Sequence, residues 1–209
     1  MFKLKDKISF KKKIFKNRGF TLIELVVSIG IFALMTGVLL SKYGNFNNSV
    51  ILTNLAYDVA ITIRTAQSYG IDVKGVENPN NANQVEFNNA YGVYFDRSSL
   101  DKSKQMIFYA DFNGNNKYTS GLGEEINIYA LKRGMYISAL CAGSSSADCA
   151  TNRTKLNIAF KRPDPKAIIS NDDNCPTDCG YARIELTSND GSKKYVEVRS
   201  TGQISVKDN

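Results

Sequence analysis

The sequence predicts an α+β protein in which a long N-terminal helix packs on an antiparallel β-sheet domain. Two observations predict this fold class. Apolar residues recur at helical spacing up to about Asp72, whereas from Tyr91 onward they follow a period of two, which is typical of strands. A helix that precedes a run of strands is the element order of an α+β fold. The sequence shows no internal repeat and no second globular domain.

The predicted helix begins with an apolar run from Phe20 to Leu40, 21 residues with one formal charge, on Glu24. At about 1.5 Å per residue this run is about 30 Å long, which is the thickness of the hydrocarbon layer of a bilayer. A secretory signal would place its small-residue cleavage site beyond the apolar run, but the small residue Gly19 lies before it. The run therefore predicts a membrane-spanning helix that survives processing.

The net charge of +7 comes entirely from the first 19 residues. This segment holds eight Lys and Arg residues against one Asp, and the 190 residues that follow are neutral overall. Basic residues before a span favour a cytoplasmic position and contact with anionic lipid. The basic composition is therefore poor support for a nucleic-acid partner.

The residues around Gly19 resemble the class III leader and N-terminal helix of type IV pilins and of type II secretion pseudopilins. The similar residues are Lys16 to Gly19 and Phe20 to Ile29. The resemblance implies cleavage between Gly19 and Phe20 by a prepilin peptidase, and methylation of the new N-terminal Phe20. It also implies an assembly role for Glu24.

Glu24 is an unusual residue for an apolar helix, because a carboxylate in hydrocarbon costs roughly 2.5 to 3.5 kcal/mol. Cleavage after Gly19 would create a positive amine on Phe20. In the similar family, the acid of one subunit meets the terminal amine of its neighbour and selects the axial register. A position in the headgroup zone, five residues into the apolar run, is a compatible alternative for the monomer.

The resemblance implies a structural subunit, minor rather than major, of a type IV pilus or a type II secretion pseudopilus. Its partners would be other pilin or pseudopilin subunits, the prepilin peptidase, an inner-membrane assembly platform and membrane lipid. It would cross the cytoplasmic membrane once with its C-terminal domain outside, and after assembly it would stand in an extracellular or periplasmic filament. The alternative is a minor pilin at the filament tip that binds DNA or another ligand in adhesion or DNA uptake.

We expect four segments: a cleavable leader (1–19), a transmembrane half-helix (20–40), an amphipathic half-helix (41–73) and a β-rich globular domain (74–209). The amphipathic half, in one long helix or in a second stacked one, carries apolar residues three or four positions apart, at Leu52, Leu55, Val59, Ile63, Ala66 and Tyr69. Residues 55–67 resemble the corresponding region of H-type minor pseudopilins and related minor pilins.

The globular domain is predicted to hold eight strands and an exposed loop at 75–89. The expected strands are 91–95, 105–110, 125–131, 135–140, 156–160, 181–187, 195–199 and 203–206, which are rich in Ile, Val, Tyr and Phe. Turn signals lie between neighbouring strands at Arg133-Gly134, at Asn189 to Gly191 and at Thr201-Gly202.

An enzyme is not expected. The chain has neither His nor Trp, and His is the commonest general base and metal ligand. No nucleophile and base constellation stands out. No cofactor is indicated apart from calcium.

One loop offers two interpretations. Asp111, Asn113 and Asn115 place oxygen side chains at alternate positions, as a calcium loop does, and Glu124 follows. A full EF-hand loop would need Gly at its sixth position and Glu at its twelfth, where this chain has Asn116 and Leu122. The other interpretation is an Asn-rich hairpin whose side chains cap their own backbone.

The four cysteines form two local pairs in the sequence, Cys141 with Cys149 and Cys175 with Cys179. Their spacings do not fit a zinc ribbon, and a position outside the cytoplasm favours oxidation to two disulfides. Four cysteines allow three connectivities. We favour the local pairs, and crossed pairs such as Cys141 to Cys175 stay open.

Basic residues are scattered through the globular domain and would form a nucleic-acid groove only if they met on one face. They are Lys132, Arg133, Arg153, Lys155, Lys161, Arg162, Lys193, Lys194 and Arg199. DNA is not the favoured partner, because a neutral chain supplies little nonspecific attraction. The simpler interpretation is a set of solvated strand edges.

Overall fold

The computed structural model describes residues 19–72, 74–79, 84–148, 153–171 and 179–208, with side chains left undescribed at 42–46. It divides into two compact units between Tyr43 and Gly44, and each unit is described by itself. The predicted leader, up to Arg18, lies outside the described residues. The four predicted segment boundaries stay a prediction.

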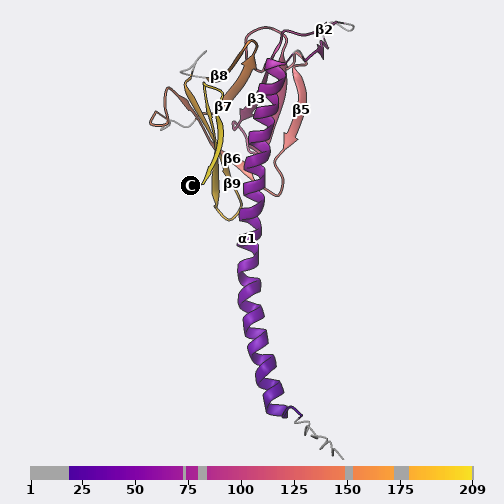
Figure 1. Ribbon diagram of the computed structural model, residues 1–209, viewed down its shortest axis with the longest axis vertical. Coiled ribbons are helices and arrows are strands. Elements are labelled where there is room, and N and C mark those ends of the chain that lie inside the picture. The colour runs from indigo at the N-terminus through magenta and orange to yellow at the C-terminus, as the bar shows by residue number, and fades with distance from the viewer. Residues whose placement is uncertain (1–18, 73, 80–83, 149–152, 172–178, 209) are drawn as a thin grey trace, which may run out of the picture. The chain divides into compact units, whose positions relative to one another are not determined.

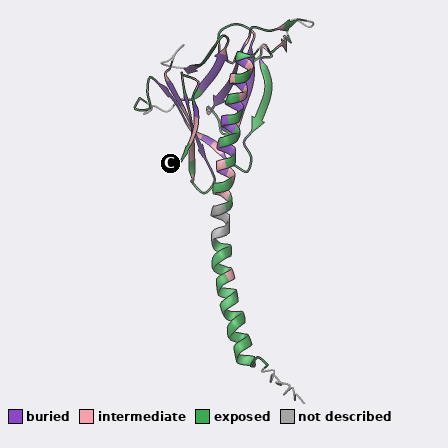
Figure 2. Ribbon diagram, viewed as in Figure 1, coloured by how far each residue is buried: buried purple, intermediate pink, exposed green. Residues whose placement is uncertain are grey.

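Helix α1 spans Leu22–Ile71 (Figure 1). Thr21 caps its start, because the Thr21 carbonyl accepts the backbone N–H of Leu25 at 3.1 Å and its hydroxyl accepts that of Glu24 at 3.3 Å. Residues Leu22–Ser41 are long and apolar enough to cross a membrane, and none of the most apolar stretch is buried within the chain. In Figure 2 nearly all of this part of α1 is coloured as exposed.

The C-terminal part of α1 belongs to the globular unit and contributes one face to its core. The buried positions recur every three or four residues, as predicted: Leu52, Leu55, Ala56, Val59, Ala60, Ile63 and Ala66. Tyr69 packs against the same core. The helix ends at Ile71, where Asp72 N–H still bonds the Ser68 carbonyl at 2.9 Å.

Two larger antiparallel sheets pack with α1 in the globular unit. The five-stranded sheet has the order β5 (Glu125–Ala130), β4 (Gln105–Asp111), β3 (Ala90–Asp96), β7 (Lys155–Lys161) and β8 (Asp164–Asn171). The four-stranded sheet has the order β11 (Ile204–Asp208), β10 (Lys193–Arg199), β9 (Tyr181–Thr187) and β6 (Tyr136–Gly143). A short 3-10 helix, η1 (Lys102–Lys104), precedes β4.

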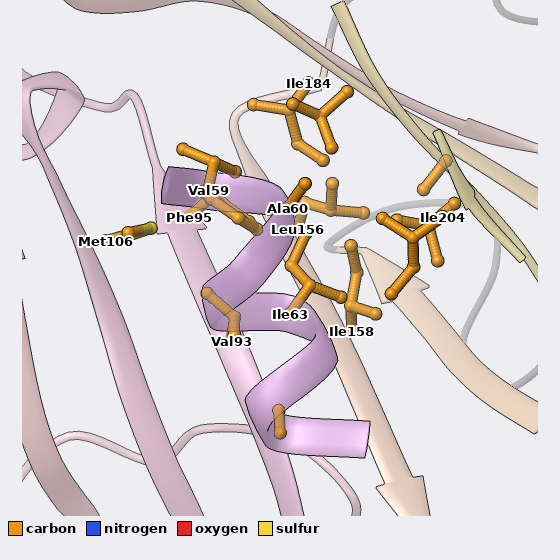
Figure 3. Packing of buried hydrophobic residues seen from close by; sticks show 14 of the residues in the cluster. Val59, Ala60, Ile63, Val93, Phe95, Met106, Leu156, Ile158, Ile184 and Ile204 are labelled. Carbon is orange, nitrogen blue, oxygen red and sulfur yellow. The ribbon is translucent and has the colours of Figure 1, made fainter. Parts of the chain in front are cut away.

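The main core lies where α1 meets both sheets. Figure 3 shows Ile63 of α1 among Ile158 of the five-stranded sheet and Ile204 of the four-stranded sheet. Polar contacts follow the same seam: Arg64 Nη2 donates to the Ile204 carbonyl at 3.4 Å. Burial of this apolar surface therefore holds the helix and the two sheets as one domain.

The outer face of the five-stranded sheet carries a second, smaller apolar cluster. Tyr94, Ile107, Tyr109 and Ala159 are buried there, although they point away from the main core. The loop between β4 and β5 folds back over them through Tyr118, whose ring lies 4.9 Å from that of Tyr94 and 5.8 Å from that of Tyr109. This loop explains why β3 is buried along its whole length.

The structure confirms the α+β class, the long helix and the eight predicted strands, but it changes the arrangement of the strands. The eight predicted strands lie in two separate sheets. Arg133-Gly134 was expected to join neighbouring strands, yet it links β5 to β6, and these lie in different sheets. The turns at 189–191 and at 201–202 do join neighbours, β9 to β10 and β10 to β11.

Two other expectations were wrong. The segment 75–89, expected as a loop, contains a short pair of strands, β1 (Val76–Glu77) and β2 (Val85–Glu86). Strand β8 was not predicted, because Pro163 and Pro165 interrupt its sequence pattern. Proline is tolerated at the edge of a sheet, where a missing N–H breaks no ladder, and β8 is an edge strand.

Candidate functional site

The predicted cleavage junction lies just before the start of α1. Gly19 and Phe20 are both exposed, and 81% of Phe20 is accessible. A Cβ placed on Gly19 would meet no atom within 4 Å. A protease needs an accessible, nonhelical backbone, and this junction supplies one.

Glu24 lies exposed in the first turn of α1. Its backbone N–H donates to the Thr21 hydroxyl, and its carbonyl accepts a hydrogen bond from Ser28 Oγ at 2.7 Å. The spacing of Thr21 and Glu24 is that of a capping box, and an acid is favourable near the positive end of a helix dipole. Glu24 therefore has a local role at the helix start besides the assembly role that the resemblance implies.

Thr21 is a functional candidate that the sequence reasoning missed. The signal was present as the pattern Thr21-x-x-Glu24, which marks a helix N-terminus.

The family model for the prokaryotic N-terminal methylation motif matches residues 14–40. This range contains Gly19, Phe20 and Glu24, and the match supports a type IV pilin-like protein. The match covers only the N-terminal helix and its leader, so it leaves the globular domain unassigned. No curated protein and no solved structure is significantly similar to the chain.

The loop between β4 and β5 begins and ends with buried carboxylates, Asp111 and Glu124. Asp111 accepts hydrogen bonds from the backbone N–H groups of Gly114, Asn115 and Asn116 at 2.8, 3.2 and 2.6 Å. Glu124 Oε2 accepts one from Thr119 N–H at 2.6 Å. The loop is therefore folded around its own carboxylates.

The amide side chains of this loop also cap its backbone. Asn113 Oδ1 accepts from Asn115 N–H at 3.1 Å, and Asn115 Oδ1 accepts from Lys117 N–H at 2.7 Å. Both amide groups donate to Thr119 Oγ1. These are the contacts expected of a self-capped hairpin, and they leave the calcium interpretation untested.

Burial of the loop changes the pKa values of Glu124 and Tyr109. Desolvation raises the pKa of Glu124, and the nearby charge of Asp111 raises it further, against the lowering effect of the hydrogen bond from Thr119. Burial, with the charges of Asp111 and Glu124, also holds the pKa of Tyr109 well above its usual range. Tyr109 is therefore neutral at any physiological pH.

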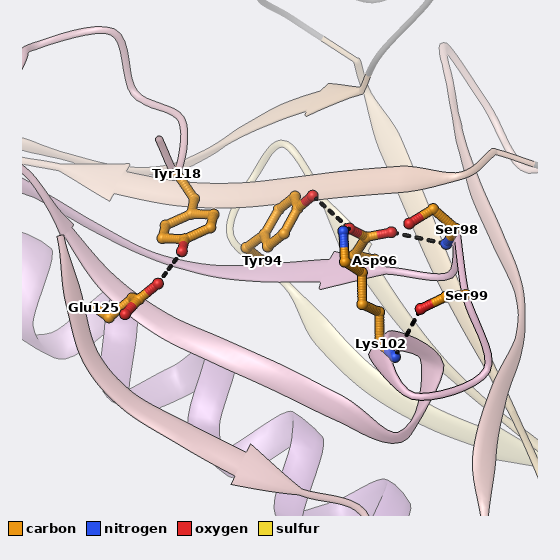
Figure 4. Close-up of polar contacts among 7 residues, drawn as sticks. All are labelled: Tyr94, Asp96, Ser98, Ser99, Lys102, Tyr118 and Glu125. Carbon is orange, nitrogen blue, oxygen red and sulfur yellow. Dashed lines mark hydrogen bonds and ion pairs between the residues drawn. The ribbon is translucent and has the colours of Figure 1, made fainter. Parts of the chain in front are cut away.

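A polar groove of about 310 Å³ lies beside this loop on the outer face of the five-stranded sheet (Figure 4). Asp96 accepts hydrogen bonds from Tyr94 Oη at 3.2 Å and Ser98 N–H at 2.7 Å, and its carboxylate lies 3.1 Å from Lys102 Nζ. Burial acts to raise the pKa of Asp96, but the bonds from Ser98 and Lys102 outweigh it and lower this pKa.

Tyr118 closes the other side of the groove and donates a hydrogen bond to Glu125. Desolvation and this bond raise the pKa of Tyr118 to about 12. No sequence pattern predicts the groove, because its residues come from β3, η1, β4, β5, β7 and the loop between β4 and β5. The pairing of β3 with β4 and β7, and of β4 with β5, brings them together.

An apolar groove of about 580 Å³ lies on the far side of β5, between this strand and α1. Its apolar lining includes Ile51, Leu55, Ile61, Met106, Leu131 and Met135. Every residue of β5 is exposed, since β5 is an edge strand. A strand pattern indicates the strand but not its edge position, so this groove could not be predicted from the sequence.

Two of the four cysteines lie among the described residues. Cys141 is in β6, next to Tyr181, and Cys179 is just before β9. Neither is a free cysteine. Cys149 and Cys175 lie outside the described residues, so the predicted pairing stays a prediction.

Several of the basic residues are held by acidic ones on the four-stranded sheet. Lys193 Nζ lies 2.8 Å from Glu185 Oε1, and Lys194 pairs with Asp208. Elsewhere, Arg162 Nε donates to Asn88 Oδ1 at 3.3 Å. Local partners therefore neutralise part of the charge that a DNA groove would need.

The described residues contain no group of three or more His, Cys, Asp or Glu side chains that could hold a metal ion. Any cation in this part of the chain would depend on amide or backbone oxygens as well as carboxylates. Such donors suit calcium and not zinc.

Proposed function

We propose that this chain is a structural subunit, minor rather than major, of a type IV pilus or a type II secretion pseudopilus. A prepilin peptidase cleaves it between Gly19 and Phe20 and methylates Phe20, and the subunit assembles through the first part of α1. The observation that carries the proposal is the methylation motif at residues 14–40, placed directly at the start of an apolar helix segment with no core of its own.

An exposed apolar helix of this length needs an apolar environment, because its surface in water is unfavourable. The bilayer supplies this environment to the single subunit, and the helices of neighbouring subunits supply it in the filament. The globular unit would stand outside the cytoplasm, since the basic leader favours the cytoplasmic side. The choice of a minor subunit rests on the resemblance of residues 55–67 to H-type minor pilins and on the size of the globular domain.

Glu24 directs assembly in this proposal. Its carboxylate would meet the Phe20 amine of a neighbouring subunit, which offsets the cost of a charge in hydrocarbon. The exposed position of Glu24 in the first turn of α1 leaves the carboxylate accessible for such a contact.

Processing is tested by coexpression of the full chain with a prepilin peptidase. Intact-mass measurement should show loss of residues 1–19 and the gain of one methyl group. Gly19→Val should stay uncleaved, because a β-branched side chain occupies the space before the scissile bond. A wild-type chain that keeps its leader in the presence of an active peptidase would contradict the proposal.

Assembly is tested by comparing Glu24→Gln with Thr21→Ala in cells that form the filament. Gln at this position keeps the hydrogen-bonding ability of a capping box but loses the charge. We expect Glu24→Gln to be processed normally and to be largely absent from sheared filaments, whereas Thr21→Ala still assembles. Equal incorporation of Glu24→Gln and wild type would show that the charge has no role in assembly.

A further inference from the structure

The two larger sheets have four edge strands, β5, β8, β6 and β11, and three of these edges are closed by other segments. Each closed edge has a hydrogen bond on its outer side: Ala167 N–H of β8 donates to the Ser200 carbonyl, Arg153 N–H donates to the Leu140 carbonyl of β6, and Arg64 Nη2 donates to the Ile204 carbonyl of β11. Such contacts prevent an edge from pairing with a further strand.

The edge of β5 is open. Leu131 N–H, directly after the strand, donates to the Lys104 carbonyl on the β4 side at 2.7 Å. Because the backbone groups of an antiparallel strand alternate in direction, those of Tyr129 face β4, and those of Ile128 and Ala130 face away from it. Within the described residues, no hydrogen bond joins this outer side of β5 to another segment.

The side chains of β5 leave its edge unprotected. Exposed edge strands usually carry Lys or Pro, which discourage pairing. Strand β8 contains Pro165 and β11 contains Lys207, but β5 contains neither residue type. Instead, Ile126, Ile128 and Tyr129 of β5 are 42%, 49% and 38% exposed. The open edge is therefore also an apolar one.

The apolar groove extends from this edge to α1. Tyr129 lines it from β5, and Ile51 and Ile61 line it from α1. Thr62 and Thr65 also line it, but their hydroxyls donate to carbonyls of the same helix at 2.9 Å, so they need no further partner. Because side chains alternate along a strand, a strand added to β5 would place every second side chain in this groove.

The two ends of β5 carry opposite charges. Glu125 begins the strand, and Lys132 and Arg133 follow it at the groove. Both bases are exposed, and no ion pair among the described residues includes either. Asp58, on α1, is the one acid that lines the groove. An antiparallel strand would therefore fit best with acids at its start, beside the two bases, and bases at its end.

From these observations we infer that β5 binds an extended segment of another polypeptide, which adds to the five-stranded sheet as an antiparallel strand. The segment is apolar at alternate positions, begins with acidic residues and ends with basic ones. A polypeptide backbone supplies donors and acceptors at the spacing of the open edge, whereas a lipid or another amphiphile would fill the groove and leave the edge unpaired.

A second copy of this chain does not fit the same site. Among its described strands only β5 has an open edge, so the two copies would pair β5 with β5. Figure 1 shows β5 extended along the part of α1 that belongs to the globular unit. Antiparallel pairing would turn the second copy by a two-fold rotation, and its α1 would run the opposite way. Two such subunits cannot enter one membrane from the same side. This step rests on the proposed function, but the site itself does not.

The test measures binding of a fluorescent synthetic peptide, Glu-Asp-Val-Thr-Val-Thr-Val-Lys-Lys, to the full chain in detergent. We expect saturable binding with a Kd below about 1 mM, and slower hydrogen exchange at 125–131 but not at 193–208. A control peptide has two adjacent prolines in place of the central Val-Thr. Since N–H groups alternate in direction, one of these prolines must face β5, and the peptide should bind about tenfold more weakly or less.

Two pairs of variants locate the binding site. Ile128→Lys places a charge on the open edge and should weaken binding about tenfold. Leu100→Lys is its matched control, because Leu100 is 77% exposed and lies outside both sheets, and it should bind as the wild type does. Lys132→Glu should weaken binding several-fold, whereas Lys161→Glu, on β7, should leave it unchanged. None of these side chains is buried, so all four variants should keep the native circular dichroism spectrum.

The inference is overturned if the first peptide shows no saturable binding, if the proline peptide binds equally well, or if Ile128→Lys binds like Leu100→Lys. A wild-type chain that is dimeric in detergent and becomes monomeric with Ile128→Lys would also overturn it, because a second copy would then occupy β5. No readout depends on cleavage of the leader, so a failure here is distinguishable from a failure of the proposed function.

Discussion

Glu185 and Lys193 connect two neighbouring strands of the four-stranded sheet. Lys193 Nζ on β10 lies 2.8 Å from Glu185 Oε1 on β9, and Ser138 Oγ on β6 donates to the same oxygen at 2.8 Å. Three of the four strands of the sheet therefore meet at one carboxylate. Burial acts to raise the pKa of Glu185, but the bonds from Lys193 and Ser138 outweigh it and lower this pKa.

This arrangement predicts a pH dependence of stability. The pKa of Glu185 is lower in the folded chain than in the unfolded chain, so the unfolded chain takes up the proton first as the pH falls. The stabilising contribution is therefore complete at neutral pH and is lost below about pH 4. Glu185→Gln should cost about 1 kcal/mol at pH 7 and much less at pH 3, as measured by urea unfolding. A constant difference between wild type and variant at both pH values would contradict the prediction.

The core between α1 and the two sheets predicts a contrast between two isoleucines of the same helix. Ile63 is 0% exposed, whereas Ile61 is 59% exposed. Ile63→Ala should lower the free energy of unfolding by about 2 to 5 kcal/mol, because it leaves a cavity between three packed elements. Ile61→Ala should change it by about 0.5 kcal/mol or less. Chemical denaturation of both variants checks this, and similar losses would show that α1 does not pack as described.

The close approach of α1 to β7 predicts that two Gly→Ala substitutions in the same helix differ in their effect on stability. A Cβ on Gly70 would lie 2.4 Å from the Phe160 carbonyl oxygen, which is a backbone atom and cannot rotate away. Gly70→Ala should therefore destabilise the globular unit by about 1 to 3 kcal/mol. Gly37→Ala, in the apolar part of the same helix, meets no atom within 4 Å and should not destabilise it. Thermal unfolding in detergent distinguishes the two, and a neutral Gly70→Ala would place the helix farther from β7.

The helix and most of the strands could be predicted, because the spacing of apolar residues along a short stretch indicates each of them. The apolar spacing of residues 52–69 marks the buried face of α1, and the buried residues match it. The eight predicted strands were found because alternation and β-branched residues are local signals. Strand β8 was not predicted, because Pro163 and Pro165 interrupt the alternation of apolar and polar residues. The sheet tolerates these prolines because β8 is an edge strand, and no local sequence pattern indicates an edge position.

The division into two sheets could not be predicted in the same way. Whether β6 pairs with β5 or with β9 depends on contacts between residues more than 40 positions apart, such as Leu140 opposite Ile184. Both partners offer the same backbone hydrogen bonds, so the choice depends on which pairing buries more apolar surface against α1. Arg133 and Gly134 both have positive φ, as the residues of a hairpin turn often do. The same conformation also suits a connection between two sheets, so the residue types alone do not distinguish the two.

The sequence alone determined the N-terminal site, because the motif around Gly19, Phe20 and Glu24 is continuous and its chemistry is carried by neighbouring residues. The tertiary structure decided everything that depends on distant residues meeting. It placed Glu124 near Asp111, assembled the polar groove from residues of β3, η1, β4, β5, β7 and the β4–β5 loop, and gave Glu185 its two partners. The physical reason is that a buried charge or a packed contact is defined by its surroundings, and those surroundings come from parts of the chain that no short pattern connects.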